Sequence, residues 1–131
     1  MSRASAMSTG PIIVTGGAGF IGSHVTRRLV SEGSRVVVVD NFFRGTRENI
    51  AEAVDTGLVE VVEMDLADDG SRRALLELLV RTKPRQILHY AAINGTEYFY
   101  DRPVDVFETN YGVTAVLMKA LEEAAEQGVR P

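Results

Sequence analysis

Cysteine and tryptophan are absent from the 131 residues, and histidine occurs only twice. Without cysteine the chain has no disulfide, no cysteine-ligated zinc and no cysteine nucleophile. Its apolar runs are far shorter than the ~18 residues that cross a bilayer, and its polar start lacks the apolar stretch of a secretory signal. The net charge of -4 gives no general attraction to nucleic acid or anionic lipid. We therefore expect a cytoplasmic protein with no nucleic-acid or membrane partner.

The chain instead alternates short apolar runs with segments of helical spacing, over a length typical of one domain. The stretch "RVVVVD" has four consecutive valines and no alternation, which is typical of a strand buried on both faces of a parallel sheet. Helical spacing is clear at Ile21, Val25 and Leu29, and in "SRRALLELLVRT", where Ser71 is the expected N-cap. We predict strands at 11–15, 35–40, 58–66 and 86–92, helices at 20–32, 71–82 and 103–127, and a short helix at 47–57.

Strands that alternate with helices form right-handed βαβ crossovers. We therefore predict an α/β fold, with a parallel sheet between two layers of helices. Residues 1–10 are expected to form a flexible tail.

Glycines at positions 16, 19 and 22 join the first predicted strand to the first predicted helix, in "IIVTGGAGFIG". Gly16 suits a tight turn at positive φ, Gly19 leaves room for a ligand against the backbone, and Gly22 lets the helix pack closely. The helix N-terminus offers free N–H groups and a positive dipole end to a diphosphate. Asp40, at the end of the next strand, can accept hydrogen bonds from ribose hydroxyls. The pattern favours a dinucleotide site, although such a turn can also be purely structural.

Asp40 also bears on which dinucleotide binds, because a carboxylate repels the 2′-phosphate of NADP. NAD is therefore the expected cofactor, and NADP is less favoured. Arg44 and Arg47 follow closely in the sequence. They could offset the repulsion of a 2′-phosphate, or they could simply be solvated loop residues.

Several stretches together resemble the extended short-chain dehydrogenase/reductase family, and within it the NAD-dependent nucleotide-sugar epimerases and dehydratases. They are "TGGAGFIGSH", "VVVVDNFFRGTRENI", "EMDLAD", "ILHYAAING" and "ETNYGVTAVLMKALEEA", which span nearly all of residues 11–130. The resemblance implies a Rossmann-type three-layer α/β/α fold, with about four strands present in the order 3-2-1-4 and one edge of the fourth strand unpaired. It also implies transient oxidation of a nucleotide sugar by bound NAD, and a homodimer in the complete enzyme. The residues that it implies for NAD binding are Gly16, Gly19, Phe20, Ile21, Gly22, Asp40, Asn41, Asp65, Leu66, Ala91, Ala92, Ile93 and Asn110.

That family moves its proton through a Tyr-x-x-x-Lys pair, and the chain contains no such pair. Its tyrosines, at positions 90, 98, 100 and 111, are followed four residues later by Asn94, Arg102, Val104 and Ala115. We therefore expect no catalytic residue here. Residues 11–131 are expected to be the N-terminal part of an NAD(P)-binding Rossmann domain, truncated before the catalytic Tyr/Lys region and the substrate domain, and not catalytic alone. The alternatives are a non-catalytic dinucleotide-binding or regulatory module and an NADP-linked carbonyl reductase of the same fold.

The polar and aromatic stretch at 94–103 is expected to be a loop after the fourth strand, where loops line ligand crevices. Its residues Thr96, Glu97 and Tyr98 could face a substrate, or the loop could simply be well packed. His24 is expected to have a surface or packing role, and His89 to be a buried histidine with its hydrogen bonds satisfied, rather than catalytic residues. The aspartates at 65, 68 and 69 lack a matching set of His or Glu, so no metal site is expected.

Overall fold

The computed structural model describes residues 9–131, so most of the expected tail lies outside the described residues. The predicted strands and the long helices are confirmed to within a few residues, but the stretch expected to be a loop at 94–103 contains a short helix. The elements are β1 (Ile12–Thr15), α2 (Phe20–Ser31), β2 (Val36–Asp40), η1 (Arg47–Ile50), α3 (Ala51–Asp55), β3 (Val59–Glu63), α4 (Ser71–Thr82), β4 (Gln86–His89), α5 (Thr96–Asp101) and α6 (Pro103–Glu126).

All four strands are parallel and lie in the predicted order, β3-β2-β1-β4. Ile13 of β1 pairs with Val37 of β2 on one side and with Ile87 of β4 on the other. Strands β1 and β2 are buried along their whole length, as the consecutive valines predict. Within residues 9–131 the outer edge of β4 has no strand partner.

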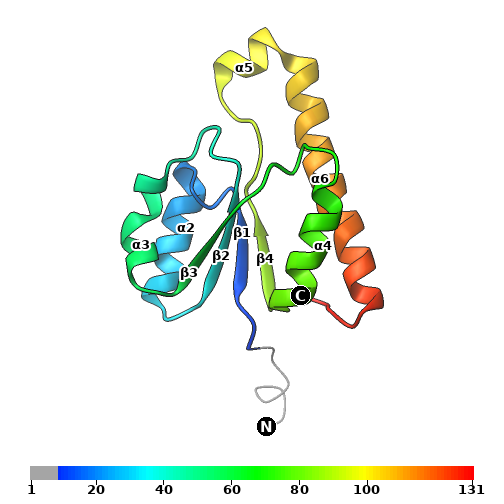
Figure 1. Ribbon diagram of the computed structural model, residues 1–131. Helices are drawn as coiled ribbons and strands as arrows, with labels where there is room; N and C mark the ends of the chain where they lie inside the picture. Colours follow the sequence, from blue (N-terminus) through cyan, green and yellow to red (C-terminus); the bar gives the residue numbers. More distant parts are fainter. Residues whose placement is uncertain (1–8) are drawn as a thin grey trace.

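Helices cover both faces of the sheet, which gives the three predicted layers (Figure 1). Alternate residues of the central strands point to opposite faces. Ile13 and Val37 therefore pack with the leucines of α4 and with Leu117 of α6. Ile12 and Val36 pack on the other face, with residues of α2, η1 and α3. Because all four strands are parallel, their carboxyl ends share one edge of the sheet, the edge on the side of α5 (Figure 1).

The buried face of α2 differs from the expected apolar stripe. Ile21 is 59% exposed and Val25 and Leu29 are only partly buried, so the stripe prediction is wrong. The helix instead buries Gly22, Ser23, Thr26 and Val30. These residues are mostly small because the first turn of α2 lies directly against the turn that follows β1.

The N-cap prediction for α4 is also wrong. Gly70, at φ 84°, precedes the helix, and no side chain caps it. The hydroxyl of Ser71 donates instead to the carbonyl oxygen of Leu66 at 3.1 Å. This bond folds the segment after β3 back onto the start of α4. Across residues 9–131, no helix is long and apolar enough to cross a membrane.

Candidate functional site

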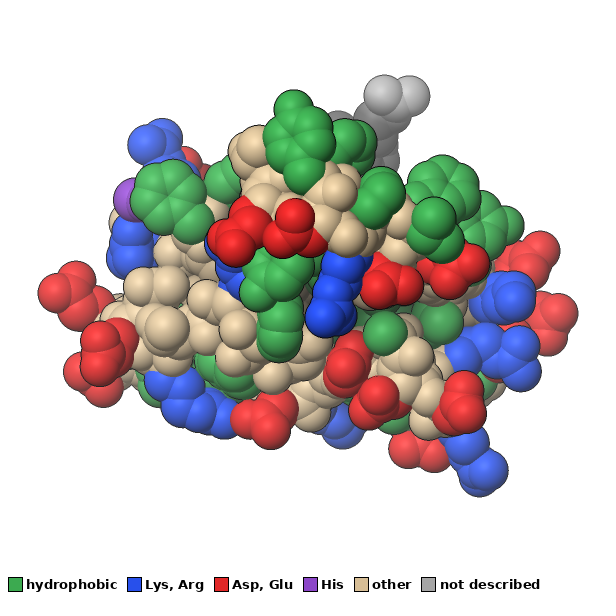
Figure 2. Space-filling model, turned by 90° about the horizontal axis from the view of Figure 1, so that it is seen from above, with side chains coloured by type: hydrophobic (Ala, Val, Ile, Leu, Met, Phe, Trp, Pro, Cys, Tyr) green, Lys and Arg blue, Asp and Glu red, His purple; other side chains and the backbone are tan. Residues whose placement is uncertain are grey.

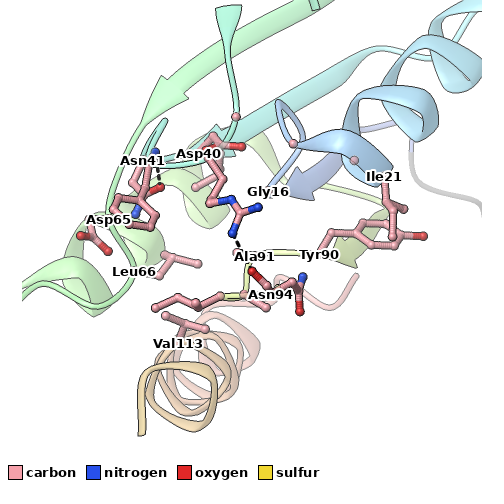
Figure 3. A pocket seen from close by; sticks show the side chains of 18 of the residues that line it. Gly16, Ile21, Asp40, Asn41, Asp65, Leu66, Tyr90, Ala91, Asn94 and Val113 are labelled. Carbon is pink, nitrogen blue, oxygen red and sulfur yellow. Dashed lines mark hydrogen bonds between the residues drawn. The ribbon is translucent and has the colours of Figure 1, made fainter. Parts of the chain in front are cut away.

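A cleft of about 460 Å³ lies at the carboxyl ends of the strands. Its walls come from the β1–α2 turn, the end of β2, the segments after β3 and β4, and α6. Figure 3 shows Asp40, Asn41 and Asp65 on one side of the cleft, and Ile21 and Tyr90 on the other. All but one of the residues predicted to bind a cofactor line this cleft: Gly16, Gly19, Phe20, Ile21, Gly22, Asp40, Asn41, Asp65, Leu66, Ala91, Ala92 and Ile93.

The β1–α2 turn has the backbone that the glycine spacing predicts. Gly16 has φ +70°, and a Cβ there would lie 2.8 Å from the backbone nitrogen of Ala91. A Cβ on Gly22 would lie 2.0 Å from the carbonyl oxygen of Gly16, so only glycine allows α2 to start so close to the turn. Gly19 is the N-cap of α2, and the first turn contains no acidic residue and no side-chain cap. Its N–H groups are therefore available to an anion in the cleft.

Asp40 ties the end of β2 to this turn. Its Oδ2 accepts the backbone N–H of Ala18 at 3.0 Å, and its Oδ1 accepts that of Phe42 at 2.8 Å. The carboxylate is almost fully buried, at 7% residue exposure. Each carboxylate oxygen has lone-pair capacity beyond one hydrogen bond. Asp40 can therefore hold the turn and still accept a hydroxyl from a ligand.

Asn110 is the predicted cofactor residue that does not line the cleft. Its amide clamps the segment after β4: Oδ1 accepts the N–H of Ile93 at 2.7 Å, and Nδ2 donates to the Ile93 carbonyl at 3.1 Å. Asn110 lines a second hollow of about 440 Å³, which shares Ile93, Asn94 and Gly95 with the cleft. Asn110 therefore holds the segment after β4, which is one wall of the cleft, against α6.

His89 at the end of β4 belongs to a chain of hydrogen bonds, as expected of a histidine with its hydrogen bonds satisfied. The hydroxyl of Thr15 accepts the N–H groups of Tyr90 and Ala91, so its own proton points to Nδ1 of His89, at 2.6 Å. Nε2 then carries the ring proton and donates to the hydroxyl of Thr114 at 3.2 Å. Burial lowers the pKa of His89, and a neutral ring suits this arrangement.

The predicted substrate residues occupy different surroundings in α5. Thr96 lines the second hollow. Glu97 is exposed and lines neither hollow. Tyr98 lies against the loop after β2, with its ring 6.2 Å from the ring of Phe43 and under the guanidinium of Arg44.

The cleft is also lined by residues that the sequence did not indicate as cofactor contacts. Arg44 is expected from sequence only as a partner for a 2′-phosphate, yet its Nη1 donates to the carbonyl oxygen of Asn94 at 2.7 Å. Gly45 lines the cleft because its backbone packs on Ala18, where a Cβ would come within 2.7 Å of the Ala18 carbonyl carbon. In the sequence, the glycine at position 45, shortly before η1, could have indicated this close approach. The remaining additions are Val39, Phe43, Met64, Tyr90, Asn94, Gly95, Thr109 and Val113.

The other candidate groups lie away from the cleft or serve local turns. His24 is exposed on α2, where it contacts Phe20 edge to face and Arg27 through Nδ1 at 2.9 Å. Asp65 accepts the N–H of Ala67 at 2.9 Å, as in a turn. No group of three or more His, Cys, Asp or Glu in the described part of the chain could hold a metal ion.

Comparison with known sequences gives one family for nearly the whole chain. The sequence model described as the NAD dependent epimerase/dehydratase family matches residues 12–130. A UDP-glucose 4-epimerase of Rhizobium leguminosarum bv. trifolii is 40% identical over 113 residues, which is 86% of this chain and 32% of that protein. A UDP-N-acetyl-alpha-D-glucosaminuronate decarboxylase of Bacillus cytotoxicus is 32% identical over 108 residues, 82% of this chain and 32% of that protein. The chain thus spans about a third of the length of these relatives.

Solved structures with the same fold include enzymes crystallised with NAD. A UDP-glucose-4-epimerase from Stenotrophomonas maltophila, with bound NAD and formylated UDP-arabinopyranose, superimposes with a TM-score of 0.78 at 28% identity, over 88% of this chain and 34% of that one. A UDP-glucose 4-epimerase of Thermus thermophilus in complex with NAD gives a TM-score of 0.74 at 32% identity, over 91% of this chain and 35% of that one.

Proposed function

The chain belongs to the NAD-dependent epimerase/dehydratase family, and from that membership we propose that it holds NAD for the transient oxidation of a nucleotide sugar. One arrangement supports the proposal above all: the glycine turn and Asp40 meet at the cleft, joined by the Ala18 N–H. A turn without side chains, a helix N-terminus without acidic residues and a fixed carboxylate together match a dinucleotide. Bound NAD would accept a hydride from the sugar and later return it.

The cleft residues divide between the parts of the cofactor. The first turn of α2, with Phe20 and Ile21, would bind the diphosphate. Asp40 would hold the adenosine ribose, with Asn41 beside it, while Asp65 and Leu66 would flank the adenine. The nicotinamide side would lie along the segment after β4, at 91–93, which Asn110 holds in place through Ile93.

We propose NAD rather than NADP because the charged side chains around the expected position of the adenosine ribose disfavour a 2′-phosphate. Asp40 presents a carboxylate where the ribose would lie. Arg44 donates to Asn94 on the far side of the cleft. Arg47 is paired with Glu63 at 3.0 Å and lies over the ring of Phe42. Arg44 thus extends to the opposite wall, where its charge would meet another part of the ligand, and the charge of Arg47 is paired. Neither guanidinium would therefore neutralise a 2′-phosphate next to Asp40.

The second hollow is the place where a sugar nucleotide would approach the nicotinamide, since it shares Ile93, Asn94 and Gly95 with the cleft. Of the three predicted substrate residues, Thr96 lines this hollow and is best placed for contact. Tyr98 would act indirectly, by holding the loop after β2. The chain has no Tyr-x-x-x-Lys pair, so we expect no epimerase or dehydratase turnover from residues 1–131 alone.

A homodimer is proposed for the complete enzyme, and a row of exposed apolar residues on α6 supports it. Val104, Phe107, Tyr111 and Met118 are each at least 59% exposed and recur at helical spacing; we refer to them as the outer face of α6. The rings of Phe107 and Tyr111 are stacked, 6.3 Å apart. Figure 2 shows hydrophobic side chains projecting over the region of α5 and α6. Such a face on a single chain is typical of a surface that is covered in the assembly.

Calorimetric titration of the chain with NAD, and in parallel with NADP, tests the cofactor. We expect saturable NAD binding and NADP binding that is at least about tenfold weaker, as expected from one unfavourable charge contact. Failure to bind NAD would overturn the proposed function. Equal or tighter binding of NADP would overturn the choice of cofactor and favour the reductase alternative.

A further inference from the structure

Among the described residues that line the cleft, Arg44 is the one with a positive charge, and Asp40 and Asp65 carry the carboxylates. The ion pairs of residues 9–131 do not include it. Its one side-chain hydrogen bond with the other residues of 9–131 is to a neutral carbonyl, that of Asn94. A guanidinium has five N–H donors, so most of its donors are left for a ligand and its charge is not neutralised by a carboxylate.

The backbone beside Arg44 is fixed against the glycine turn. Gly45 packs on Ala18 so closely that a Cβ there would come within 2.7 Å of it. The N–H of Thr46 and the side-chain amide of Asn49 both donate to the Ala18 carbonyl, at 3.2 and 2.9 Å. The side chain of Arg44 therefore starts beside the β1–α2 turn and reaches Asn94, fifty positions further along the chain. The contact joins the loop after β2 to the segment after β4, where Asn94 lies at the cleft (Figure 3).

The far side of the cleft is shaped to receive this guanidinium. A Cβ on Gly95, which has φ +122°, would lie 3.1 Å from Nη1 of Arg44. The ring of Tyr98 lies 5.5 Å from the guanidinium carbon, which adds a cation–π contact. The position of Arg44 is thus set from both ends, by Gly45 on one side and by Asn94, Gly95 and Tyr98 on the other.

We propose that Arg44 is the cationic ligand of the dinucleotide diphosphate and lies across it as a strap. This inference rests on the proposed function. The first turn of α2 would bind the diphosphate through N–H groups and a partial positive charge. Arg44 would approach the same group from across the cleft and supply a full charge through a planar fork that matches phosphate oxygens. Asn94 would keep one N–H and so hold the strap closed over the bound cofactor.

The test is calorimetric titration of the wild-type chain and Arg44→Gln with NAD, ADP and adenosine. We expect Arg44→Gln to weaken NAD and ADP by about 10- to 100-fold, the size of a lost charge-assisted contact. Adenosine lacks the diphosphate, so its binding should not change. Added salt should weaken NAD binding to the wild type more than to Arg44→Gln, because the variant has lost the charge. Arg44→Lys keeps the charge without the fork and should lie between the two.

Arg47→Gln is the matched control, because Arg47 lies in the same region but pairs with Glu63, and it should leave all three affinities unchanged. Unchanged NAD and ADP affinities in Arg44→Gln would overturn this inference and leave the proposed function intact. An equal loss for adenosine would overturn it too, since the substitution would then act through the shape of the cleft. Absence of NAD binding to the wild type would overturn both proposals.

Discussion

One carboxylate oxygen of Asp40 accepts the backbone N–H of Ala18 at 3.0 Å, which joins the end of β2 to the glycine turn after β1. The other oxygen accepts the N–H of Phe42. The side chain is thus part of the framework of the cleft, besides facing the ligand. Replacing Asp40 would leave two backbone donors without their acceptor and would disturb the turn together with any ribose contact. A clean test of the ribose contact changes the ligand instead of the protein.

Comparison of ADP with 2′-deoxy-ADP makes that test, because the two ligands differ by one hydroxyl. If Asp40 accepts the ribose hydroxyls, removal of the 2′-hydroxyl deletes a hydrogen bond to a charged acceptor. We expect 2′-deoxy-ADP to bind about tenfold more weakly than ADP. Calorimetry on the wild-type chain measures both affinities, and equal values would show that Asp40 does not contact that hydroxyl.

Gly22 and Gly112 both lie inside helices, but a side chain would meet very different surroundings at the two positions. A Cβ on Gly22 would lie 2.0 Å from the Gly16 carbonyl oxygen, whereas one on Gly112 meets nothing within 4 Å. We expect Gly22→Ala to lower the free energy of unfolding by about 3 kcal/mol. Gly112→Ala should raise it by about 0.5–1 kcal/mol, because alanine is the better helix former.

Urea unfolding followed by circular dichroism measures the free energies of both glycine variants. Gly112→Ala is the matched control for the exchange of glycine for alanine in a helix. A Gly22→Ala variant as stable as the wild type would mean that α2 can move away from the turn, and the close packing would then not be what requires glycine there.

The pH dependence of stability should report the neutral state of His89. Burial lowers its pKa in the folded chain below the ordinary value of 6.5. Between the lowered pKa and 6.5 the unfolded chain binds more protons than the folded chain, so stability rises with pH. The contribution of His89 is therefore complete above pH 6.5 and is lost as pH falls through 6.5 towards the lowered value.

His89→Gln isolates this contribution because glutamine can hydrogen-bond but does not titrate in this range. We expect the free energy of unfolding of the wild type to fall more steeply than that of His89→Gln between about pH 8 and about pH 5. Urea unfolding at several pH values gives the two slopes. Parallel slopes would show that the protonation of His89 is equally favourable in the folded and unfolded chains.

The sequence predicted the central strands and most of the cleft because both follow from local patterns, whereas the sheet order was predicted from the family resemblance. Consecutive valines at 36–39 indicate a central strand, and glycines at spacings of three indicate a turn that opens into a helix. The carboxyl ends of parallel strands share one edge, so the predicted contacts after β1, β2, β3 and β4 had to converge.

The details that sequence did not predict depend on contacts between distant segments. The prediction of an apolar stripe on α2 was wrong because the helix packs closely on the turn at Gly16. That packing favours small buried residues such as Gly22 and Thr26, and it leaves Ile21 at the cleft. The short helix α5 lies between Gly95 and Pro103 and is rich in aromatic residues, so its local signal is that of a loop. The reach of Arg44 to Asn94 joins residues fifty positions apart, and no local pattern encodes it.

The outer face of α6 gives the last prediction, which concerns assembly. Its apolar residues recur at positions 104, 107, 111 and 118, along one side of the helix, and two of them, Phe107 and Tyr111, have stacked rings. On the opposite side, Val113, Leu117 and Ala120 pack into the core. The helix is therefore apolar on two sides, and only one of them is covered within residues 9–131.

A charge placed on the exposed side should oppose self-association without affecting the core. We expect the wild-type chain to form dimers or larger species at micromolar concentration, and Phe107→Glu to shift it towards monomer, because burying an unpaired carboxylate in an apolar interface is costly. Sedimentation velocity measures the distribution, and circular dichroism checks that the variant is folded. Val54→Glu is the matched control, since Val54 is an exposed apolar residue of α3 on the other face of the sheet. If the wild-type chain is a clean monomer, or if both variants lower association equally, the outer face of α6 is not the contact between copies.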